Sequence, residues 1–283
     1  MPVVEGQSPP RDDLHGRIVA NLFLENSTRT RVSFTVAAHR LGATTVDLLG
    51  SSSSASKGET LVDTARNVAA MGVSAIVVRC AASGGAHLVA RHVDVPVINA
   101  GDGRCEHPTQ GLLDTLALTR SLGTTDLHDR TIGIVGDIAH SRVARSAAYA
   151  LTTLGADVVF IGPPSMVSGS LADLLEGSDD KRGGVHVAHD FDAALPHLDA
   201  VMMLRVQFER GASITSDYAT HFGLTTQRAS RLPDHAVILH PGPINRGLEM
   251  APEVADGPRS LVMDQVACGV AMRMAVLLEQ LSH

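Results

Sequence analysis

The chain has 283 residues, about the length of two ordinary domains. Its 44% hydrophobic and 19% charged residues are typical of a soluble globular protein rather than of a disordered or fibrous chain. A net charge of −7, only 3% aromatic residues and the lack of a basic tail argue against a nucleic-acid-binding protein.

Membrane, secreted and metal-binding classes are also disfavoured. No apolar run approaches the roughly 18 residues of a membrane helix, and residues 1–13 lack the features of a signal peptide. The cysteines, Cys80, Cys105 and Cys268, are odd in number and form no Cys-x-x-Cys pair, and the histidines show no metal-ligand spacing. We therefore predict a cytoplasmic protein that binds no metal, no membrane and no nucleic acid.

The first part of the chain alternates short β-branched runs with segments of helical period. Strands are predicted at residues 18–25, 44–49, 75–80 and 96–100, with helices at residues 30–41 and 59–71. Strand, helix and strand in this rhythm form parallel βαβ units, with helices on both faces of the sheet.

The second part repeats this rhythm after a linking helix. Pro108 suits the first position of that helix, which we expect to run to about Ser121, where Gly123 can stop it. Further strands are predicted at residues 131–136, 157–161, 185–187, 200–204 and 236–239, with helices at 142–154 and 264–281. The predicted fold class is α/β: two domains, each a parallel sheet flanked by helices, joined by a bridging helix.

The segment between the first strand and the first helix has the composition of an anion site. Ser27-Thr28-Arg29-Thr30-Arg31 combines three hydroxyls and two guanidiniums with the backbone N–H groups of a helix N-terminus. A Ser or Thr that only caps a solvated helical turn is the alternative. The two arginines favour phosphate binding.

Other polar residues also follow predicted strands, where ligands of parallel sheets bind. Arg79 ends the third strand, and His107-Pro108-Thr109-Gln110 follows the fourth. Taken singly, Arg79 is explained as a surface arginine and His107 as a histidine that caps a helix. Together with the anion segment, they place a cation, a titratable hydrogen-bond donor and an amide around one crevice, a set that can polarise a carbonyl beside a phosphate.

Lys57 follows a Ser-rich loop at residues 51–56, and it and Lys181 are the only lysines among 23 basic residues. Arginine captures phosphates and carboxylates through two parallel hydrogen bonds, although genomic base composition also explains such a bias. Lys57 is either a solvated loop lysine or, because lysine is so rare here, a part of the anion site.

In the second part of the chain, polar segments again follow strands, at residues 136–142, 205–207 and 240–247. Pro241-Gly242-Pro243 predicts a rigid turn that holds backbone carbonyls in place. Dinucleotide binding at residues 133–137 is disfavoured, because the segment lacks the glycine pattern that this binding needs.

These residues together resemble the aspartate/ornithine carbamoyltransferase family, from Leu22 to the last helix. Ser27-Thr28-Arg29-Thr30-Arg31 and His107-Pro108-Thr109-Gln110 are similar to its carbamoyl-phosphate motifs. Three features resemble the aspartate branch: Lys57-Gly58-Glu59, Arg205-Val206-Gln207 with Glu209-Arg210, and His240-Pro241-Gly242-Pro243 with Asn245-Arg246-Gly247. The Cys-Leu-Pro turn of the ornithine branch is missing from the sequence.

The resemblance implies a role for each of these residues. The phosphate is held by Ser27, Thr28, Arg29 and Thr30, with Ser54 and Lys57. The carbonyl oxygen, as it gains charge, is bound by Arg79, His107 and Thr30. The carbamoyl NH2 is oriented by Gln110 and the carbonyls of Pro241 and Gly242. The two aspartate carboxylates are bound by Arg142, Arg205 and Gln207, with Lys57, Gly242 and Pro243 also at the aspartate.

The implied reaction transfers the carbamoyl group of carbamoyl phosphate to L-aspartate in pyrimidine biosynthesis, without a cofactor. The implied assembly is a homotrimer with shared active sites, in which Lys57 and one serine of the loop, Ser52, Ser53 or Ser54, reach a neighbouring subunit. A larger assembly with regulatory or dihydroorotase-like chains stays open. So do two alternative functions, a carbamoyltransferase for another amine such as ornithine and a non-catalytic homologue acting as a partner subunit.

By the same resemblance, residues 1–120 form the carbamoyl-phosphate domain, with the final helix, residues 264–283, packed on it, and residues 121–263 form the aspartate domain. One departure concerns the N-terminus. The family normally begins with an additional helix that packs on the last one, whereas residues 1–17 look unstructured here. We expect the apolar stripe of the last helix to be partly uncovered.

Overall fold

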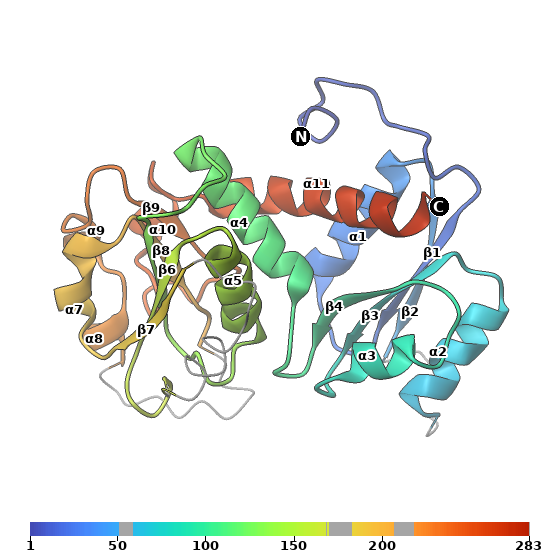
Figure 1. The fold of residues 1–283 in the computed structure, drawn as a ribbon, viewed down its shortest axis with the longest axis horizontal. Coiled ribbons are helices and arrows are strands. Elements are labelled where there is room, and N and C mark those ends of the chain that lie inside the picture. The colour runs from blue at the N-terminus through green and yellow to red at the C-terminus, as the bar shows by residue number, and fades with distance from the viewer. Residues whose placement is uncertain (51–58, 168, 170–182, 207–217, 283) are drawn as a thin grey trace. The chain divides into compact units, whose positions relative to one another are not determined.

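The computed structural model describes residues 1–50, 59–167, 169, 183–206 and 218–282. The chain divides into two compact units (Figure 1). Unit 1 contains Met1–Gln110 and Val266–His283, and unit 2 contains Gly111–Gln265.

Unit 1 is built on a four-stranded parallel sheet in the order β2-β1-β3-β4. Its strands are β1 (Ile18–Phe23), β2 (Thr44–Leu49), β3 (Ala75–Cys80) and β4 (Val97–Asp102). Its helices are α1 (Thr28–Arg40), α2 (Leu61–Ala70) and α3 (Gly85–Ala90), joined by the C-terminal part of α11 (Val262–Leu281). Alternate residues of β1 serve opposite faces: Val19 packs in the core with α1 and α11, and Ala20 in the core with α2 and α3.

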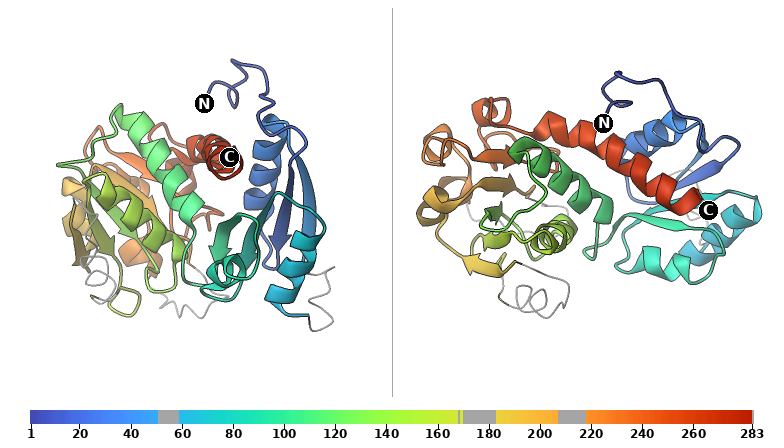
Figure 2. Two further views of the ribbon diagram at one scale, coloured as in Figure 1. Left: turned by 45° about the vertical axis from the view of Figure 1, so that its right-hand side comes forward. Right: turned by 45° about the horizontal axis from the view of Figure 1, so that its top comes forward.

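Unit 2 contains a five-stranded parallel sheet in the order β7-β6-β5-β8-β9. The strands are β5 (Thr131–Val135), β6 (Asp157–Ile161), β7 (Val185–Ala188), β8 (Ala200–Met203) and β9 (Val237–Leu239). One face packs against α4 (Pro108–Leu122) and α5 (Arg142–Thr153). The other packs against short helices (Figure 2): α7 (Phe191–Ala194), η2 (Leu195–His197), α8 (Tyr218–Phe222), α9 (Thr226–Ala229) and α10 (Pro252–Ala255).

The predicted α/β class and parallel sheets are confirmed, and the long elements begin and end within two residues of their predicted bounds. The strand predicted at residues 18–25 ends at Phe23, because the residues after it form the loop that leads to Ser27, the N-cap of α1. The strand predicted at 96–100 instead spans Val97–Asp102. The short helices were not predicted, since four to six residues are too few to show a helical period.

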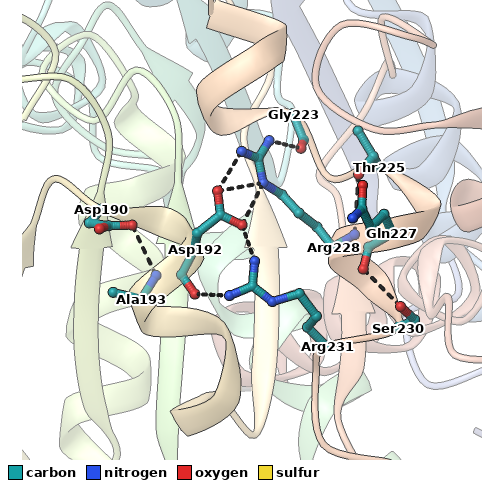
Figure 3. A network of polar contacts seen from close by, with 9 residues as sticks. All are labelled: Asp190, Asp192, Ala193, Gly223, Thr225, Gln227, Arg228, Ser230 and Arg231. Carbon is teal, nitrogen blue, oxygen red and sulfur yellow. Dashed lines mark hydrogen bonds and ion pairs between the residues drawn. The ribbon is translucent and has the colours of Figure 1, made fainter.

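The short helices α7 and α9 are joined by a polar network rather than by a wide apolar stripe (Figure 3). Asp192 accepts a hydrogen bond from Arg228 at 2.7 Å, and its backbone oxygen accepts another from Arg231 at 2.8 Å. The Arg228 guanidinium, the main cause, lowers the pKa of the Asp192 carboxyl. Arg228 also lies over the ring of Phe191, 5.8 Å from its centroid. Long-range charge pairs of this kind leave no periodic signal in the sequence.

The N-terminal segment packs on the last helix although it forms no helix or strand before β1. Leu14 is buried in the same core as Met274, Leu277 and Leu281 of α11, and Val3 and Val4 pack against this core. The expectation that the apolar stripe of α11 is partly uncovered is therefore wrong for Met274, Leu277 and Leu281, whereas other residues of the stripe, Ala267, Val270, Ala271 and Leu278, are only half-buried. An irregular segment can bury an apolar side chain without showing a period.

Asp199 ties together the amino-terminal ends of β5 and β8 and makes the stability of unit 2 depend on pH. It accepts hydrogen bonds from the Thr131 amide at 2.9 Å, from Arg130 at 3.0 Å and from His235 at 2.8 Å. Burial raises the pKa of this carboxyl, but these three donors together outweigh burial, and the pKa falls below its ordinary value. Because the folded pKa is lowered, this stability is present at neutral pH and is lost as the pH falls through the lowered pKa.

We therefore expect Asp199→Asn to destabilise the protein at pH 7 by about 1–2 kcal/mol. The difference from the wild type should shrink below about pH 4, where the wild-type carboxyl is itself being protonated. Thermal melts from pH 7 to pH 3 measure this. Asp256→Asn is the control, since Asp256 also has a lowered pKa beside Arg246 but lies on the surface. An Asp199→Asn deficit that stays constant with pH would contradict the linkage.

Candidate active site

The sheet of unit 1 has a switch point between β1 and β3, because the chain runs from β1 to β2 on one side and from β3 to β4 on the other. Ligands of open parallel sheets bind at such a point, outside the carboxyl ends of the strands. Phe23, the last residue of β1, pairs with Arg79 of β3, and the Leu24 amide donates to the Arg79 carbonyl at 2.8 Å. The loop that leads into α1 therefore begins beside Arg79.

The N-terminus of α1 has the features of an anion site. Ser27 is the N-cap residue with an extended backbone, yet its hydroxyl makes no capping hydrogen bond, and the first turn contains no acidic residue. Thr28 and Arg29 are exposed and Thr30 is buried. The helix dipole and the hydroxyl groups favour a negatively charged ligand at this end.

The two arginines of the anion segment differ in role. Arg31 forms an ion pair with Asp47 of β2, and Asp47 also accepts from the buried Asn21 amide at 2.8 Å. Arg31 thus fastens α1 to the edge strand. Arg29 is on the exposed side of the first turn.

Arg79 and His107 come together from the ends of β3 and β4. The Arg79 side chain is only 12% exposed; its Nη1 donates to the Ala100 carbonyl at 3.1 Å and lies 3.5 Å from Nε2 of the buried His107. Arg79 Nε lies 3.9 Å from a carboxylate oxygen of Glu25. Because a guanidinium only donates, His107 Nε2 is the acceptor in this contact, which assigns the ring proton to Nδ1.

Gln110 lies one turn further along, in the first turn of α4. Its backbone N–H donates to the His107 carbonyl at 2.9 Å, so both residues belong to the same helix start. The carboxyl edge of the unit 1 sheet therefore holds a mostly buried guanidinium, an imidazole, an amide and a helix N-terminus. This combination can bind an anion and stabilise charge on an oxygen.

Unit 2 has its own switch point, between β5 and β8. Arg142 is the first residue of α5 and is buried, and the Ser141 hydroxyl before it caps the helix by accepting from the Ala144 amide at 3.1 Å. Arg205 lies two residues beyond the end of β8 and is partly buried. Two arginines from adjacent strands thus follow the carboxyl edge of this sheet, an arrangement suited to carboxylates.

The turn after β9 completes the polar edge of unit 2. Gly242 has a φ of +65°, a conformation that favours glycine, and its amide donates to Nδ1 of His240 at 2.8 Å. The His240 amide donates to the buried Gln265 at 3.0 Å. The predicted rigid turn is therefore fixed by hydrogen bonds, with Pro241 and Gly242 partly buried and Pro243 exposed.

Three predicted site residues, Ser54, Lys57 and Gln207, lie outside the described residues, as do Ser52, Ser53, Glu209 and Arg210. Within the described part of the chain, no three His, Cys, Asp or Glu side chains gather as a metal site. None of the described helices is long and apolar enough to cross a membrane.

Comparison with known families settles the relationship. Residues 4–120 match the carbamoyl-P binding domain of aspartate/ornithine carbamoyltransferases, and residues 128–279 match the Asp/Orn binding domain. The chain belongs to the aspartate/ornithine carbamoyltransferase family. The predicted resemblance is thereby confirmed.

Two relatives of this carbamoyltransferase belong to the aspartate branch. The aspartate carbamoyltransferase catalytic subunit of Myxococcus xanthus is 53% identical over 268 residues, which cover 93% of this chain and 86% of that protein. The corresponding subunit of Salinispora arenicola is 50% identical, over 93% of this chain and 84% of that one.

Solved structures of aspartate transcarbamoylase from Trypanosoma cruzi are similar to this carbamoyltransferase over its whole length. The complex with carbamoyl aspartate and phosphate has a TM-score of 0.88 and 30% identity, covering 99% of this chain and 88% of that one. The complex with carbamoyl phosphate and aspartate has a TM-score of 0.85 and 28% identity, with the same coverage.

One carboxylate of this carbamoyltransferase was missed in the sequence. Glu249 is completely buried and accepts hydrogen bonds from the segments after β8 and β9. Its neighbours Leu248 and Met250 are apolar, which indicates a core segment, and the sequence contains no signal that could have identified its partners.

Proposed function

We propose that this chain is the catalytic chain of an aspartate carbamoyltransferase. It transfers the carbamoyl group of carbamoyl phosphate to the α-amino group of L-aspartate, giving N-carbamoyl-L-aspartate and phosphate. The observation that carries the proposal is the meeting of Arg79 and His107 beside the N-terminus of α1, in a chain about half identical to aspartate carbamoyltransferase subunits. Such a site can hold a phosphate and polarise the carbonyl next to it.

The phosphate of the substrate is held by the first turn of α1. Ser27, Thr28 and Thr30 offer hydroxyl groups, and Arg29 a guanidinium that can donate two parallel hydrogen bonds. Ser54 and Lys57 complete the phosphate site from a neighbouring subunit, and Lys57 also contacts the aspartate. Neutralising the phosphate charge makes it a better leaving group.

The chemical step proceeds through a tetrahedral intermediate. The aspartate amine attacks the carbonyl carbon, and the oxygen that gains negative charge is stabilised by Arg79, His107 and Thr30. The bond from carbon to the phosphate oxygen then breaks, and the departing phosphate takes the proton that the amine loses. Gln110 and the carbonyls of Pro241 and Gly242 orient the carbamoyl NH2. These residues position the substrates and stabilise charge. The reaction needs only this from the protein and requires no cofactor.

The second substrate is bound by residues of unit 2. Arg142, Arg205 and Gln207 bind the two carboxylates of aspartate, and Gly242 and Pro243 also lie at the aspartate. Ornithine carries a cationic side chain that needs an acidic partner. Arg205 is itself a cation and would repel that side chain. Charge therefore favours aspartate as the acceptor of the carbamoyl group.

The wider organisation is proposed on the same basis. Residues 1–120, with helix 264–283, form the carbamoyl-phosphate domain, and residues 121–263 form the aspartate domain. Three chains form a cytoplasmic homotrimer with shared active sites that serves pyrimidine biosynthesis, alone or in a larger assembly with regulatory or dihydroorotase-like chains.

The purified chain should consume carbamoyl phosphate with L-aspartate and give carbamoyl aspartate at saturable rates. The test is a product assay with aspartate and, in parallel, with ornithine, run beside a native mass measurement that should give three chains. Faster turnover with ornithine would favour the other-amine alternative. A folded chain that turns over neither amine would instead be a non-catalytic homologue.

A further inference from the structure

Glu249 connects the two loops that the proposed function assigns to aspartate. It lies in unit 2, between the turn after β9 and α10, and its side chain is completely buried. We infer that Glu249 is a positioning residue that fixes Arg205 and the Pro241-Gly242 turn in the geometry that binds aspartate. This inference rests on the proposed function.

Both oxygens of the Glu249 carboxylate accept hydrogen bonds. Oε1 accepts from the Val206 amide at 2.8 Å and from Asn245 Nδ2 at 2.7 Å. Oε2 accepts from the Asn245 amide at 2.6 Å and lies 3.4 Å from Nε2 of His240. A buried carboxylate needs such donors, because burial without them is strongly unfavourable.

The His240 ring extends this connection to the turn itself. Its Nδ1 accepts from the Gly242 amide, so the ring proton is on Nε2, which faces Glu249. The His240 amide donates to Gln265, and Gln265 donates to Asp114 of α4 at 2.7 Å. Glu249 and Gln265 therefore hold the turn from two directions.

The positions of these donors indicate that Glu249 supports the loops that bind the substrate rather than the hydrophobic core. Val206 directly follows Arg205, and the His240-to-Asn245 segment contains the two proposed substrate-facing carbonyls. Val206 lies beyond the end of β8, and His240 and Asn245 lie beyond the end of β9. Removing the carboxylate should loosen these two loops and leave the strand pairing intact.

The test is Glu249→Gln, which keeps the size of the side chain but replaces one acceptor oxygen by an NH2 donor. Whichever way the amide turns, its NH2 then faces an N–H donor. We expect the KM for aspartate to rise at least ten-fold with a smaller change in kcat, while the dissociation constant for inorganic phosphate, measured by calorimetry, stays within two-fold.

Asp199→Asn is the control, because it removes another hydrogen-bonded carboxyl of unit 2, partly buried and at the opposite edge of the sheet. It should lower the melting temperature and leave the KM for aspartate unchanged. If both variants raise this KM in proportion to their loss of stability, Glu249 has only a structural role and the inference is overturned. Asn245→Ala removes a single donor and should also raise the KM for aspartate. It takes the place of Glu249→Gln in this test if that variant does not fold.

Amide hydrogen exchange provides a readout that does not need activity. In Glu249→Gln, exchange should accelerate at Val206 and in residues 240–250 but not in β5 or β8. Unchanged exchange at these amides, or an aspartate KM within two-fold of the wild type, would overturn the inference while leaving the proposed function intact. A wild type that fails to carbamoylate aspartate would refute the proposed function, and the exchange result would still decide whether Glu249 holds the two loops.

Discussion

Replacing Arg79 by alanine is expected to reduce kcat by about 100- to 1000-fold, the loss typical when one donor to a developing oxyanion is removed. The Arg79 guanidinium lies next to His107 and is mostly buried, so water cannot fully replace it. Steady-state kinetics with both substrates saturating measure the effect. A thermal melt is needed as well, because Arg79 also donates to the Ala100 carbonyl.

Arg31→Ala is the matched control for this experiment. Arg31 belongs to the same strand-end region but is paired with Asp47 of β2. Its loss should lower stability and change kcat only a few-fold. Equal losses of kcat in the two variants would show that removal of either arginine damages the fold, and the assignment of Arg79 to the carbonyl oxygen would fail.

Replacing Arg205 by alanine is expected to raise the KM for aspartate by roughly 10- to 100-fold, since a hydrogen bond to a charged group contributes about 1.5–3 kcal/mol. The KM for carbamoyl phosphate should change by less than about three-fold on the same scale. Arg205→Lys should recover only part of the loss, because lysine keeps the charge but not the planar pair of donors.

Initial rates over a grid of both substrate concentrations separate these two KM values. Arg246→Ala is the control, because Arg246 lies in the same unit and pairs with Asp256 on the surface. It should leave both KM values unchanged. An equal rise of both KM values in Arg205→Ala would contradict a specific role at aspartate.

The sequence predicted the parts of the fold and site that depend on local pattern. Buried strands and long amphipathic helices each show a period, and the ends of parallel strands necessarily share one edge. Arg79 ends one strand and His107 follows the next, so they were predicted to share this edge, and Arg79 Nη1 lies 3.5 Å from His107 Nε2. The individual substrate contacts assigned to them stay predictions.

The features that were missed depend on long-range pairing. Arg31 and Asp47 are 16 positions apart, and Glu249 and Val206 are 43 apart, so no local spacing connects either pair. The composition of the anion segment alone does not tell Arg29 from Arg31, and the ion pair of Arg31 forms because β2, which carries Asp47, lies beside β1. The short helices α7 and α9 depend on the same kind of distant partner, Asp192 with Arg228.

The switch points also have a consequence for folding. In unit 1 the loop after β1 meets Arg79 only when β1 and β3 have paired, although more than 50 positions separate Phe23 from Arg79 in the chain. Pairings of this kind are non-local and form slowly. A nascent chain that has made only the first βαβ unit therefore contains the anion segment but not Arg79 or His107. The capacity to bind the phosphate substrate should emerge late, and the substrate then acts as a ligand that stabilises only the completed sheet.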